Sequence, residues 1–305
     1  MPYVLFVAFY LEVTSCYTAL NGLSTSQSVT RSQRNQIFTR CIEKWRMQGV
    51  GASQRGIQAK EMEVRAENEL EGQSVVITGG SSGIGLATAV RARDAGASRI
   101  VIAGRSPEKL SRAAAVVGKT ADPRQLDVTD EGAVSRFFAD LGLIDHLVTA
   151  AAGTYRGKIT ETDTVAAKAL FESKYWGQHH YIKHAGPRIR GGGSITLFSG
   201  WISRKPMVAT GTLAAIDAAI EAIARIASLE LAPVRVNAVV PGMIDTPLWG
   251  ARLTAEQQKA HFEKVGAGLP VGRAGTADDV AHAVMFLMTN GFTSGAIVDV
   301  DGGQR

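Results

Sequence analysis

A glycine-rich segment over residues 78–85 contains the first residues whose types and spacing suggest chemistry. Gly79, Gly83 and Gly85 alternate with small hydroxyl residues, and the β-branched run Ser74–Ile77 precedes them. Glycine lets the backbone turn tightly, so that N–H groups approach a pyrophosphate, which the N-terminus of a following helix stabilises through its dipole. Strand, turn and helical pattern come in the order that dinucleotide binding requires; the alternative is a tight strand–helix turn with no ligand.

The second β-branched run, Arg99–Ala103, tests which dinucleotide is bound. An NAD-binding chain would follow it with a carboxylate for the adenine ribose 2′-hydroxyl, but here Gly104, Arg105 and Ser106 follow. A guanidinium binds phosphate through two parallel hydrogen bonds, so this trio favours NADP(H) over NAD(H). The alternative is that Arg105 is a solvated charge at a helix start.

The elements that must position these residues alternate regularly from Ser74 onward. Such alternation predicts an α/β fold with one doubly wound parallel sheet, the Rossmann fold, in a single domain. We expect strands near Ser74–Ile77, Arg99–Ala103, Arg124–Leu126, His146–Thr149, Ser194–Phe198, Arg235–Val240 and Ile297–Val300. We expect helices such as Ile84–Ala95, Pro107–Val117, Thr164–Ala185, Leu213–Leu231 and Ala277–Met288.

At this point the chain resembles the short-chain dehydrogenase/reductase superfamily, over about Leu70 to Gly303. The resemblance implies an oxidoreductase that forms a homodimer or homotetramer through its long helices and C-terminal strand. It rests on six ordered motifs: Thr78–Gly85, Leu126–Val128, Asp145–Val148, Arg235–Val239, Pro241–Pro247 and Asp301–Gly303.

The resemblance also implies which residues hold the cofactor. Asp127 would accept from the adenine amino group, and Ile244 and Thr246 would hold the nicotinamide carboxamide. After the fourth strand, small residues over 149–153 replace the family's Asn-Asn-Ala-Gly. The expected cofactor-binding residues are Gly79, Ser81, Ser82, Ile84, Arg105, Ser106, Asp127, Val128, Ala151, Lys174, Pro241, Gly242, Ile244 and Thr246.

The family's catalytic pattern is missing. Members usually carry a Tyr, a Lys four residues later, a Ser and an Asn, because the alkoxide formed by hydride transfer to a carbonyl needs a proton. Here the Tyr position falls on Leu213 and the Lys position on Asp217, while Lys174 takes the place of the Asn. The Ser position falls on Ser199 or Gly200, according to register.

Lys174 and Asp217 occupy positions that face each other across the family's active site. We therefore expect a charge swap in which the ammonium and the carboxylate pair near the nicotinamide ribose, since neither is then buried alone. The alternative is a surface-facing Asp217 with Glu221 one turn later. The expected catalytic residues are Lys174, Asp217 and Ser199.

Three mechanisms remain open without the tyrosine. Lys174 could donate the proton, with a pKa lowered by burial. The substrate could instead be an iminium or conjugated acceptor that needs little acid help, with Asp217 stabilising a cation. Finally, the cleft could hold NADP(H) without redox chemistry, as a cyclase, isomerase or binding protein. The sequence favours an NADP(H)-dependent reductase of a C=O or C=N bond.

Other residues receive weaker assignments. His180 and His184 lie four residues apart, as zinc ligands would, but no third ligand follows at suitable spacing, so we expect no metal. Tyr155 is a substitute proton donor to test, although loop packing also explains it. A pocket for an apolar small-molecule substrate would be lined by Trp201, Met207, Trp249 and Phe262. Residues 248–268 would form a lid over it.

Charge separates the N-terminal part from the rest of the chain. The 305 residues carry 33 basic and 28 acidic side chains, a formal net charge of +5, all of which arises within residues 1–60. The balanced remainder argues against nucleic acid as a partner. We expect residues 1–61 to be an extension that is disordered, cleaved or upstream of the true start, and residues 62–305 to be the working domain. We expect that domain to be cytoplasmic and not bound to a membrane. Organelle targeting or a membrane anchor within residues 1–61 stays open.

Overall fold

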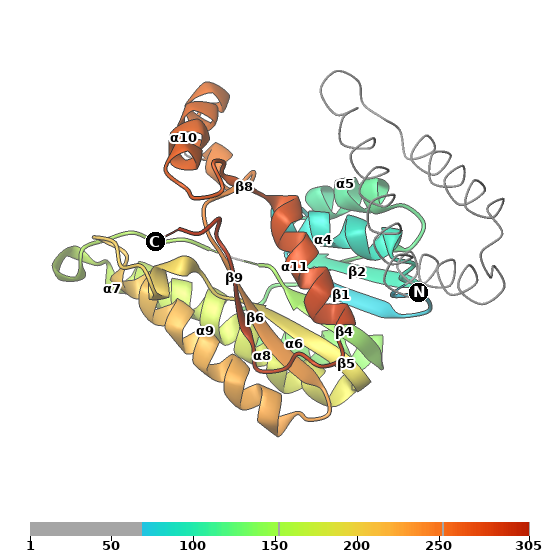
Figure 1. Ribbon diagram of the computed structural model, residues 1–305. Helices are drawn as coiled ribbons and strands as arrows, with labels where there is room; N and C mark the ends of the chain where they lie inside the picture. Colours follow the sequence, from blue (N-terminus) through green and yellow to red (C-terminus); the bar gives the residue numbers. More distant parts are fainter. Residues whose placement is uncertain (1–68, 152, 252, 305) are drawn as a thin grey trace, which may run out of the picture. The chain divides into compact units, whose positions relative to one another are not determined.

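Seven parallel strands form the central sheet of the described part of the chain (Figure 1). The computed structural model describes residues 69–151, 153–251 and 253–304. The strand order is β3-β2-β1-β4-β5-β6-β9, so the order reverses between β1 and β4, where ligands bind in open α/β sheets. The strands are β1 (Ser74–Thr78), β2 (Arg99–Gly104), β3 (Ala121–Gln125), β4 (Ile144–Thr149), β5 (Ile189–Phe198), β6 (Arg235–Pro241) and β9 (Ile297–Val300).

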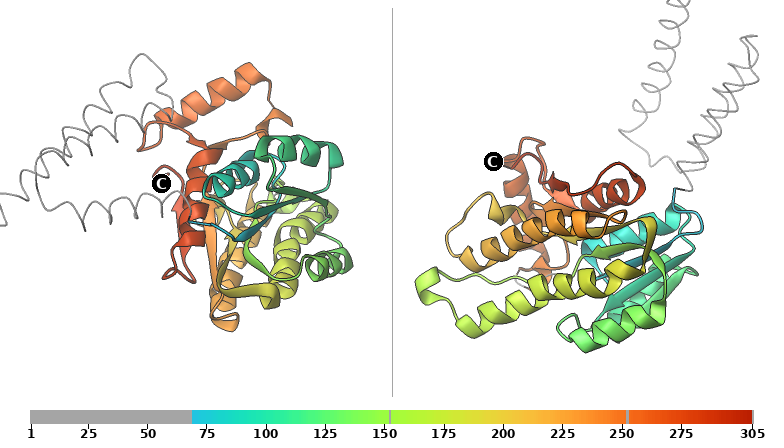
Figure 2. Two further views of the ribbon diagram at one scale, coloured as in Figure 1. Left: turned by 90° about the vertical axis from the view of Figure 1, so that its right-hand side faces the viewer. Right: turned by 90° about the horizontal axis from the view of Figure 1, so that it is seen from below.

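Helices cover both faces of the sheet, which confirms the predicted doubly wound α/β fold. Figure 2 shows one group of helices in front of the sheet when the molecule is seen from below. That group consists of α6 (Glu131–Leu141), α8 (Gly177–Ala185) and α9 (Gly211–Glu230). The opposite face carries α4 (Gly83–Asp94), α5 (Pro107–Val117) and α11 (Ala277–Thr289).

Alternation along the strands explains why the sheet is covered on both faces. In β1, Val76 packs into the core under α6, α8 and α9, whereas Val75 and Ile77 pack into the core under α4, α5 and α11. All three side chains are fully buried. Successive side chains of a strand point to opposite faces, so a strand that is apolar at every position needs helices on both sides.

Side-chain caps fix where several helices begin. Asp130 accepts a hydrogen bond from the N–H of Ala133 at 2.8 Å at the start of α6. Thr254 and Thr276 form capping boxes at the starts of α10 (Ala255–Ala267) and α11. Each cap satisfies N–H groups that lack a partner within the helix.

Several element boundaries differ from the sequence prediction; β5, for example, begins at Ile189 rather than at Ser194. The residues explain two of the differences. The third strand, expected at Arg124–Leu126, is Ala121–Gln125 and contains Pro123, which is tolerated because β3 lies at the sheet edge. The helix expected over Thr164–Ala185 is three consecutive segments: α7 (Thr164–Leu170), a π-helix at Phe171–Trp176, and α8. The π-helix contains Lys174, and such insertions are common at functional sites.

The prediction for residues 1–61 lies outside the residues that the structure describes. Across the three described ranges, none of the helices is both long enough and apolar enough to cross a membrane.

Candidate active site

The glycine turn between β1 and α4 is packed so closely that only glycine fits. Gly79 has a φ of +72°, and a Cβ there would lie 2.5 Å from the backbone nitrogen of Ala151. A Cβ on Gly85 would lie 2.4 Å from the carbonyl oxygen of Gly79. Ser82 forms the extended N-cap of α4, and among the described residues its side chain makes no capping hydrogen bond. The turn therefore leads directly into a helix N-terminus, as a phosphate site requires.

The turn also meets the segment that follows β6. The residue nearest to a Cβ on Gly83 would be Thr246, at 3.6 Å. Thr246 comes directly after the short strand β7 (Ile244–Asp245), which pairs with β8 (Gly275–Thr276). The turn expected to hold the pyrophosphate and a residue expected to hold the nicotinamide therefore lie side by side at the carboxyl edge of the sheet.

Charged side chains follow β2 and β3 at the same edge. Arg105 is exposed, and its charge helps to lower the pKa of Asp127, although the main cause is hydrogen bonding from Thr129. The N–H and the hydroxyl of Thr129 donate to Asp127 Oδ1 at 3.0 and 2.8 Å. Ser106 Oγ accepts from the N–H of Lys109 at 3.3 Å and so caps α5. Arg105 therefore lies near enough to Asp127 for its charge to act on that carboxyl group.

Lys174 and Asp217 form a buried ion pair. Lys174 Nζ lies 2.5 Å from Asp217 Oδ1, and the two residues are 5% and 1% exposed. The predicted contact between the two charged groups is present, and the alternative of a surface-facing Asp217 is wrong. That the pair lies near a nicotinamide ribose stays a prediction. Burial raises the pKa of Asp217 above its ordinary value, while the Lys174 ammonium acts in the opposite direction.

Gly200 makes room for the Asp217 carboxylate. A Cβ at Gly200 would lie 2.5 Å from Asp217 Oδ2, so a serine at this position would collide with the carboxylate. Ser199 Oγ instead faces α9, where it lies 3.0 Å from the carbonyl oxygen of Asp217 and 3.2 Å from Glu221 Oε1. Lys174, Gly200 and Asp217 are therefore sterically and electrostatically coupled.

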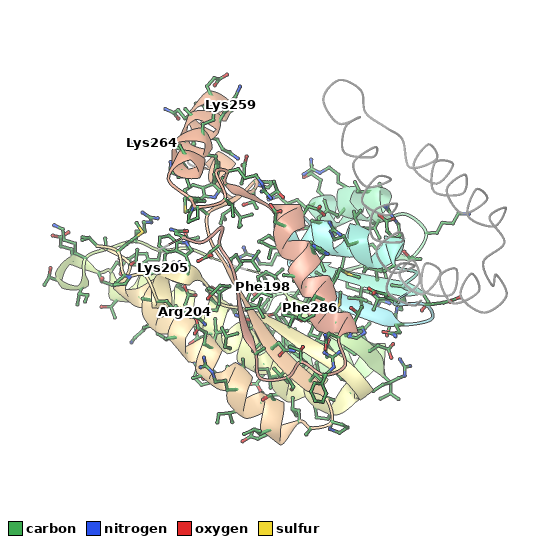
Figure 3. The ribbon with its side chains drawn as sticks, viewed as in Figure 1. Phe198, Arg204, Lys205, Lys259, Lys264 and Phe286 are labelled. Carbon is green, nitrogen blue, oxygen red and sulfur yellow. The ribbon has the colours of Figure 1, made fainter. Side chains whose placement is uncertain are left out.

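Glu221 ties this part of α9 to the loop after β5. Its Oε1 accepts from the Ser203 hydroxyl at 2.8 Å, and its Oε2 lies 3.1 Å from Arg204 Nη2. Arg204 also pairs with Asp299 of β9 at 2.6 Å, and its neighbour Lys205 pairs with Asp301. Figure 3 labels Arg204 and Lys205 among the side chains of the molecule. Sequence reasoning did not assign Glu221 or Arg204 a role. The i, i+4 spacing of Asp217 and Glu221 was the available signal, because it places both carboxylates on one helix face.

The predicted lid is a helix held by an aromatic cluster. The Trp249 ring lies 5.2 Å from His261 and 5.6 Å from Phe262, measured between ring centroids. Trp249 Nε1 also donates to the carbonyl oxygen of Ile244 at 3.2 Å. These contacts couple α10 to the segment expected to hold the nicotinamide. Of the other expected lining residues, Trp201 packs against the core, and Met207 is 40% exposed.

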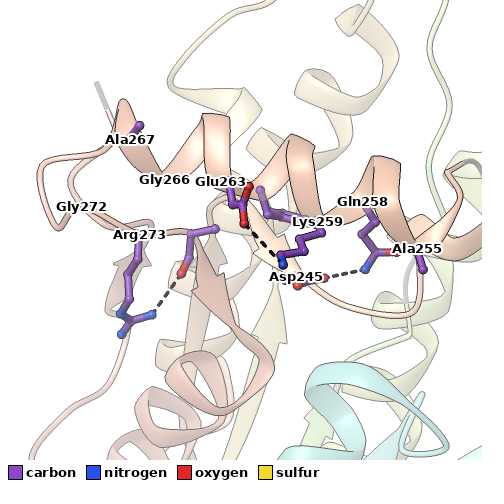
Figure 4. Close-up of a pocket in the computed structure, with 11 residues that line it drawn as sticks. Asp245, Ala255, Gln258, Lys259, Glu263, Gly266, Ala267, Gly272 and Arg273 are labelled. Atoms are coloured by element: carbon purple, nitrogen blue, oxygen red, sulfur yellow. Dashed lines mark hydrogen bonds and ion pairs between the residues drawn. The ribbon is translucent and has the colours of Figure 1, made fainter. Parts of the chain in front are cut away.

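A pocket of about 640 Å³ lies between α10 and residues 272–274 (Figure 4). Its lining includes Asp245, Lys259, Glu263 and Arg273, and Gln258 Nε2 donates to Asp245 Oδ1 at 2.5 Å. No expected cofactor-binding or catalytic residue is among the described residues that line it. It is therefore separate from the Lys174–Asp217 pair.

His180 and His184 of α8 belong to an ion-pair cluster around Glu131. His184 Nε2 lies 3.0 Å from Glu131 Oε1 and His180 Nε2 lies 3.7 Å from Glu131 Oε2. Hydrogen bonds from Lys183 and His184 lower the pKa of Glu131 to about 2. In the part of the chain that is described, no group of three ligating side chains is arranged to hold a metal ion. Tyr155, the substitute proton donor, accepts a hydrogen bond at its hydroxyl from the N–H of Asp163 at 2.8 Å.

Comparison with known proteins identifies the family. Residues 79–305 match the family model described as enoyl-(acyl carrier protein) reductase. The short-chain dehydrogenase/reductase ATR9 of Stachybotrys chlorohalonatus is 33% identical over 77% of this chain and 97% of its own length. This chain is a short-chain dehydrogenase/reductase. Because the members of this family that it matches are named as dehydrogenases and reductases, the chain is an oxidoreductase by family.

Two further relatives are similar over most of the chain. A probable 2,4-dienoyl-CoA reductase of Caenorhabditis elegans is 31% identical to this chain. The match covers 79% of this chain and 83% of the reductase. A solved small-chain dehydrogenase in complex with NADPH is 33% identical, with a TM-score of 0.64, over 76% of this chain and 98% of that one. The predicted family membership and Rossmann fold are thus confirmed.

Proposed function

We propose that this short-chain dehydrogenase/reductase is an NADP(H)-dependent enzyme that reduces a C=O or C=N bond of an apolar small molecule without a tyrosine acid. The observation that carries the proposal is the buried Lys174–Asp217 pair. By the family alignment, Lys174 stands at the Asn position and Asp217 at the Lys position, while Leu213 stands at the Tyr position. Removing two charges from water is costly, and buried carboxylates with shifted pKa values cluster at functional sites, which supports a functional role for this pair.

The residues present fit a phosphorylated dinucleotide. Gly79 and Gly85 have no room for a side chain, so the turn is shaped by close backbone approach, and α4 begins directly after it. The NADPH complex of a related small-chain dehydrogenase supports the same cofactor here. Bound NADPH would supply the hydride. The residues that would hold it are Gly79, Ser81, Ser82, Ile84, Arg105, Ser106, Asp127, Val128, Ala151, Lys174, Pro241, Gly242, Ile244 and Thr246.

The Lys174–Asp217 pair would orient the reacting groups. An ammonium has three N–H donors, and Asp217 Oδ1 takes one of them, which leaves two for ribose or substrate oxygens. Asp217 fixes the position of the ammonium, which would otherwise be buried without a counter-charge. We assign Ser199 a positioning role, because its hydroxyl lies against acceptors of α9.

The test is a titration followed by a turnover assay. NADPH fluorescence should change on binding, and NADPH should then be oxidised with at least one member of a panel of ketones, quinones and cyclic imines. Binding without turnover across the panel would favour the alternative, a redox-silent, cyclase or isomerase function in the same cleft. Absence of binding would contradict both.

The variant Leu213→Tyr with Asp217→Lys rebuilds the family's catalytic spacing. If the departures are specialised, this variant should lose activity toward the native substrate class and gain none toward ketones. Recovered ketone reduction would show that the departures are simple decay.

The working unit and its assembly also remain proposals. We expect residues 62–305 to retain NADPH binding when produced alone, and to form a dimer or tetramer in size-exclusion chromatography. The cytoplasmic location stays a prediction.

A further inference from the structure

The second carboxylate oxygen of Asp217 has no partner among the described residues. Oδ1 accepts from Lys174, whereas Oδ2 is buried and makes no hydrogen bond there. The residue is only 1% exposed. Buried carboxylate oxygens are nearly always hydrogen-bonded, because an unpaired one loses its interaction with water and gains nothing in return. An orphaned acceptor at this position therefore points to a ligand that supplies a donor.

The orphaned oxygen faces the carboxyl edge of the sheet. Gly200 comes two residues after the end of β5, and a Cβ built on it would lie 2.5 Å from Asp217 Oδ2. The oxygen thus occupies the space into which a side chain at position 200 would project. Since the Ser199 hydroxyl faces α9, we take position 200 as the family's serine position. The family's catalytic hydroxyl would then lie here. An acceptor has replaced a donor at the substrate-facing position.

The surrounding groups keep that position rich in acceptors. Ser199 Oγ lies against the carbonyl oxygen of Asp217 and the carboxylate of Glu221, so its hydroxyl faces α9. Glu221 is itself 7% exposed, and Leu213 stands where the family has tyrosine. A ketone offers only acceptor lone pairs, which a carboxylate oxygen repels. A protonated imine offers an N–H donor and a positive charge, which the same oxygen stabilises.

We propose that the substrate of this enzyme is a cation of the protonated-imine class, held by a charge-assisted hydrogen bond from its C=N–H⁺ nitrogen to Asp217 Oδ2. The proposal rests on the NADP(H)-dependent reduction proposed above and specifies its substrate. In the reduction, a hydride with its two electrons bonds to the imine carbon, and the C=N π pair becomes the nitrogen lone pair. The products are a neutral amine and the oxidised coenzyme, so the step itself consumes no proton. That balance explains how the site works without a phenol.

A matched pair of acceptors provides the first test on the unaltered full-length chain. 3,4-Dihydroisoquinoline and 1-tetralone share a fused ring system but carry C=N and C=O respectively. With NADPH at neutral pH, we expect kcat/KM for the imine to exceed that for the ketone by about tenfold or more, since charge-assisted hydrogen bonds are worth that factor. Equal rates, a preference for the ketone, or no turnover of either by a chain that binds NADPH would overturn the proposal.

The Asp217→Asn variant distinguishes the substrate from the cofactor ribose as the donor to Oδ2. We expect this variant to lose most of the imine preference while its NADPH dissociation constant stays within about threefold of the unaltered value. Weaker NADPH binding with an unchanged imine preference would show that the oxygen serves the ribose instead. Asp140→Asn, at an exposed aspartate of α6, is the matched control and should change neither quantity.

A binding measurement on the unaltered chain provides a further test. It depends neither on turnover nor on the folding of a variant. We expect calorimetry with the NADP⁺-saturated chain to show 1,2,3,4-tetrahydroisoquinolinium binding about tenfold or more tightly than isochroman, its neutral oxygen analogue. Equal affinities, or no binding of either, would overturn the substrate class. Failure of the chain to bind NADPH or NADP⁺ is a separate result, and it would overturn the proposed function as a whole.

Discussion

The two halves of the candidate site differ in what shapes them: backbone in one half and buried charged side chains in the other. The half around β1, β2 and α4 is shaped by backbone: Gly79 and Gly85 have no space for side chains, and they keep the family's spacing. The half between the π-helix and α9 is shaped by buried charges, with Lys174 paired to Asp217 and Glu221 paired to Arg204. Under the proposed function, the comparison teaches that the glycine turn of the dinucleotide-binding framework is kept while the groups that do chemistry are exchanged as a coupled set.

The largest expected effect concerns the buried pair itself. Lys174→Met leaves the Asp217 carboxylate buried without its counter-charge and should lower the free energy of unfolding by about 3 kcal/mol or more. Adding Asp217→Leu removes the unpaired charge and should recover much of that loss. Urea denaturation measures both. Additive losses in the double variant would mean that the charges do not depend on each other, and Lys168→Met, at an exposed lysine of α7, is the control.

The second prediction contrasts this pair with a buried histidine in the cofactor-binding half. Burial lowers the pKa of His146 to about 4 in the folded chain, where its ring lies between Ser194 Oγ and Gln73 Oε1. The unfolded chain therefore takes up the proton first. The contribution of the neutral His146 ring to the free energy of unfolding is fully present above about pH 6.5. It falls as the pH drops toward 4, by roughly 3 kcal/mol in all.

His146→Asn should flatten that part of the stability profile. The measurement is the free energy of unfolding between pH 7 and pH 5, compared with the unaltered chain. An identical slope in both chains would show that the ring is not the titrating group.

The third prediction sharpens the role of the cofactor-binding half. Arg105→Ala should raise the NADPH dissociation constant by roughly 10- to 100-fold and leave that of NADH nearly unchanged, because only NADPH carries the phosphate that a guanidinium binds in two places. Fluorescence titration measures both constants. Arg112→Ala, at an exposed arginine of α5, is the control. An equal loss for both coenzymes would remove Arg105 from phosphate recognition.

The smallest expected effect lies in the network behind the pair. Glu221→Gln keeps the shape but removes the charge that Arg204 contacts, and it should cost about 1 kcal/mol of stability. Glu230→Gln, at the exposed end of α9, should stay within about 0.5 kcal/mol of the unaltered chain. Equal effects at the two positions would mean that the Glu221 network does not hold the loop after β5.

The sequence predicted the backbone-built half more fully than the charged half. Glycine spacing between a strand and a helix is a local signal. The turn at Gly79, the strand before it and the helix after it could therefore be placed. The Lys174–Asp217 pair could be expected only because both departures fell at facing positions of one family. Gly200 could not be chosen over Ser199, because the choice depends on a contact with a helix that begins eleven residues later. The third strand was misplaced because Pro123 argues against a strand unless the strand is known to lie at an edge.

The most direct test of the central claim is the Gly200→Ala variant, assayed with NADPH and the best acceptor of the panel. A Cβ at this position would lie 2.5 Å from Asp217 Oδ2, so the carboxylate must move. We predict a fall in kcat of about tenfold or more with the NADPH dissociation constant unchanged, and no effect of Gly191→Ala, whose Cβ would lie 4.0 Å from its nearest neighbour. Unchanged turnover in Gly200→Ala would contradict the claim that the Lys174–Asp217–Gly200 arrangement is the catalytic centre.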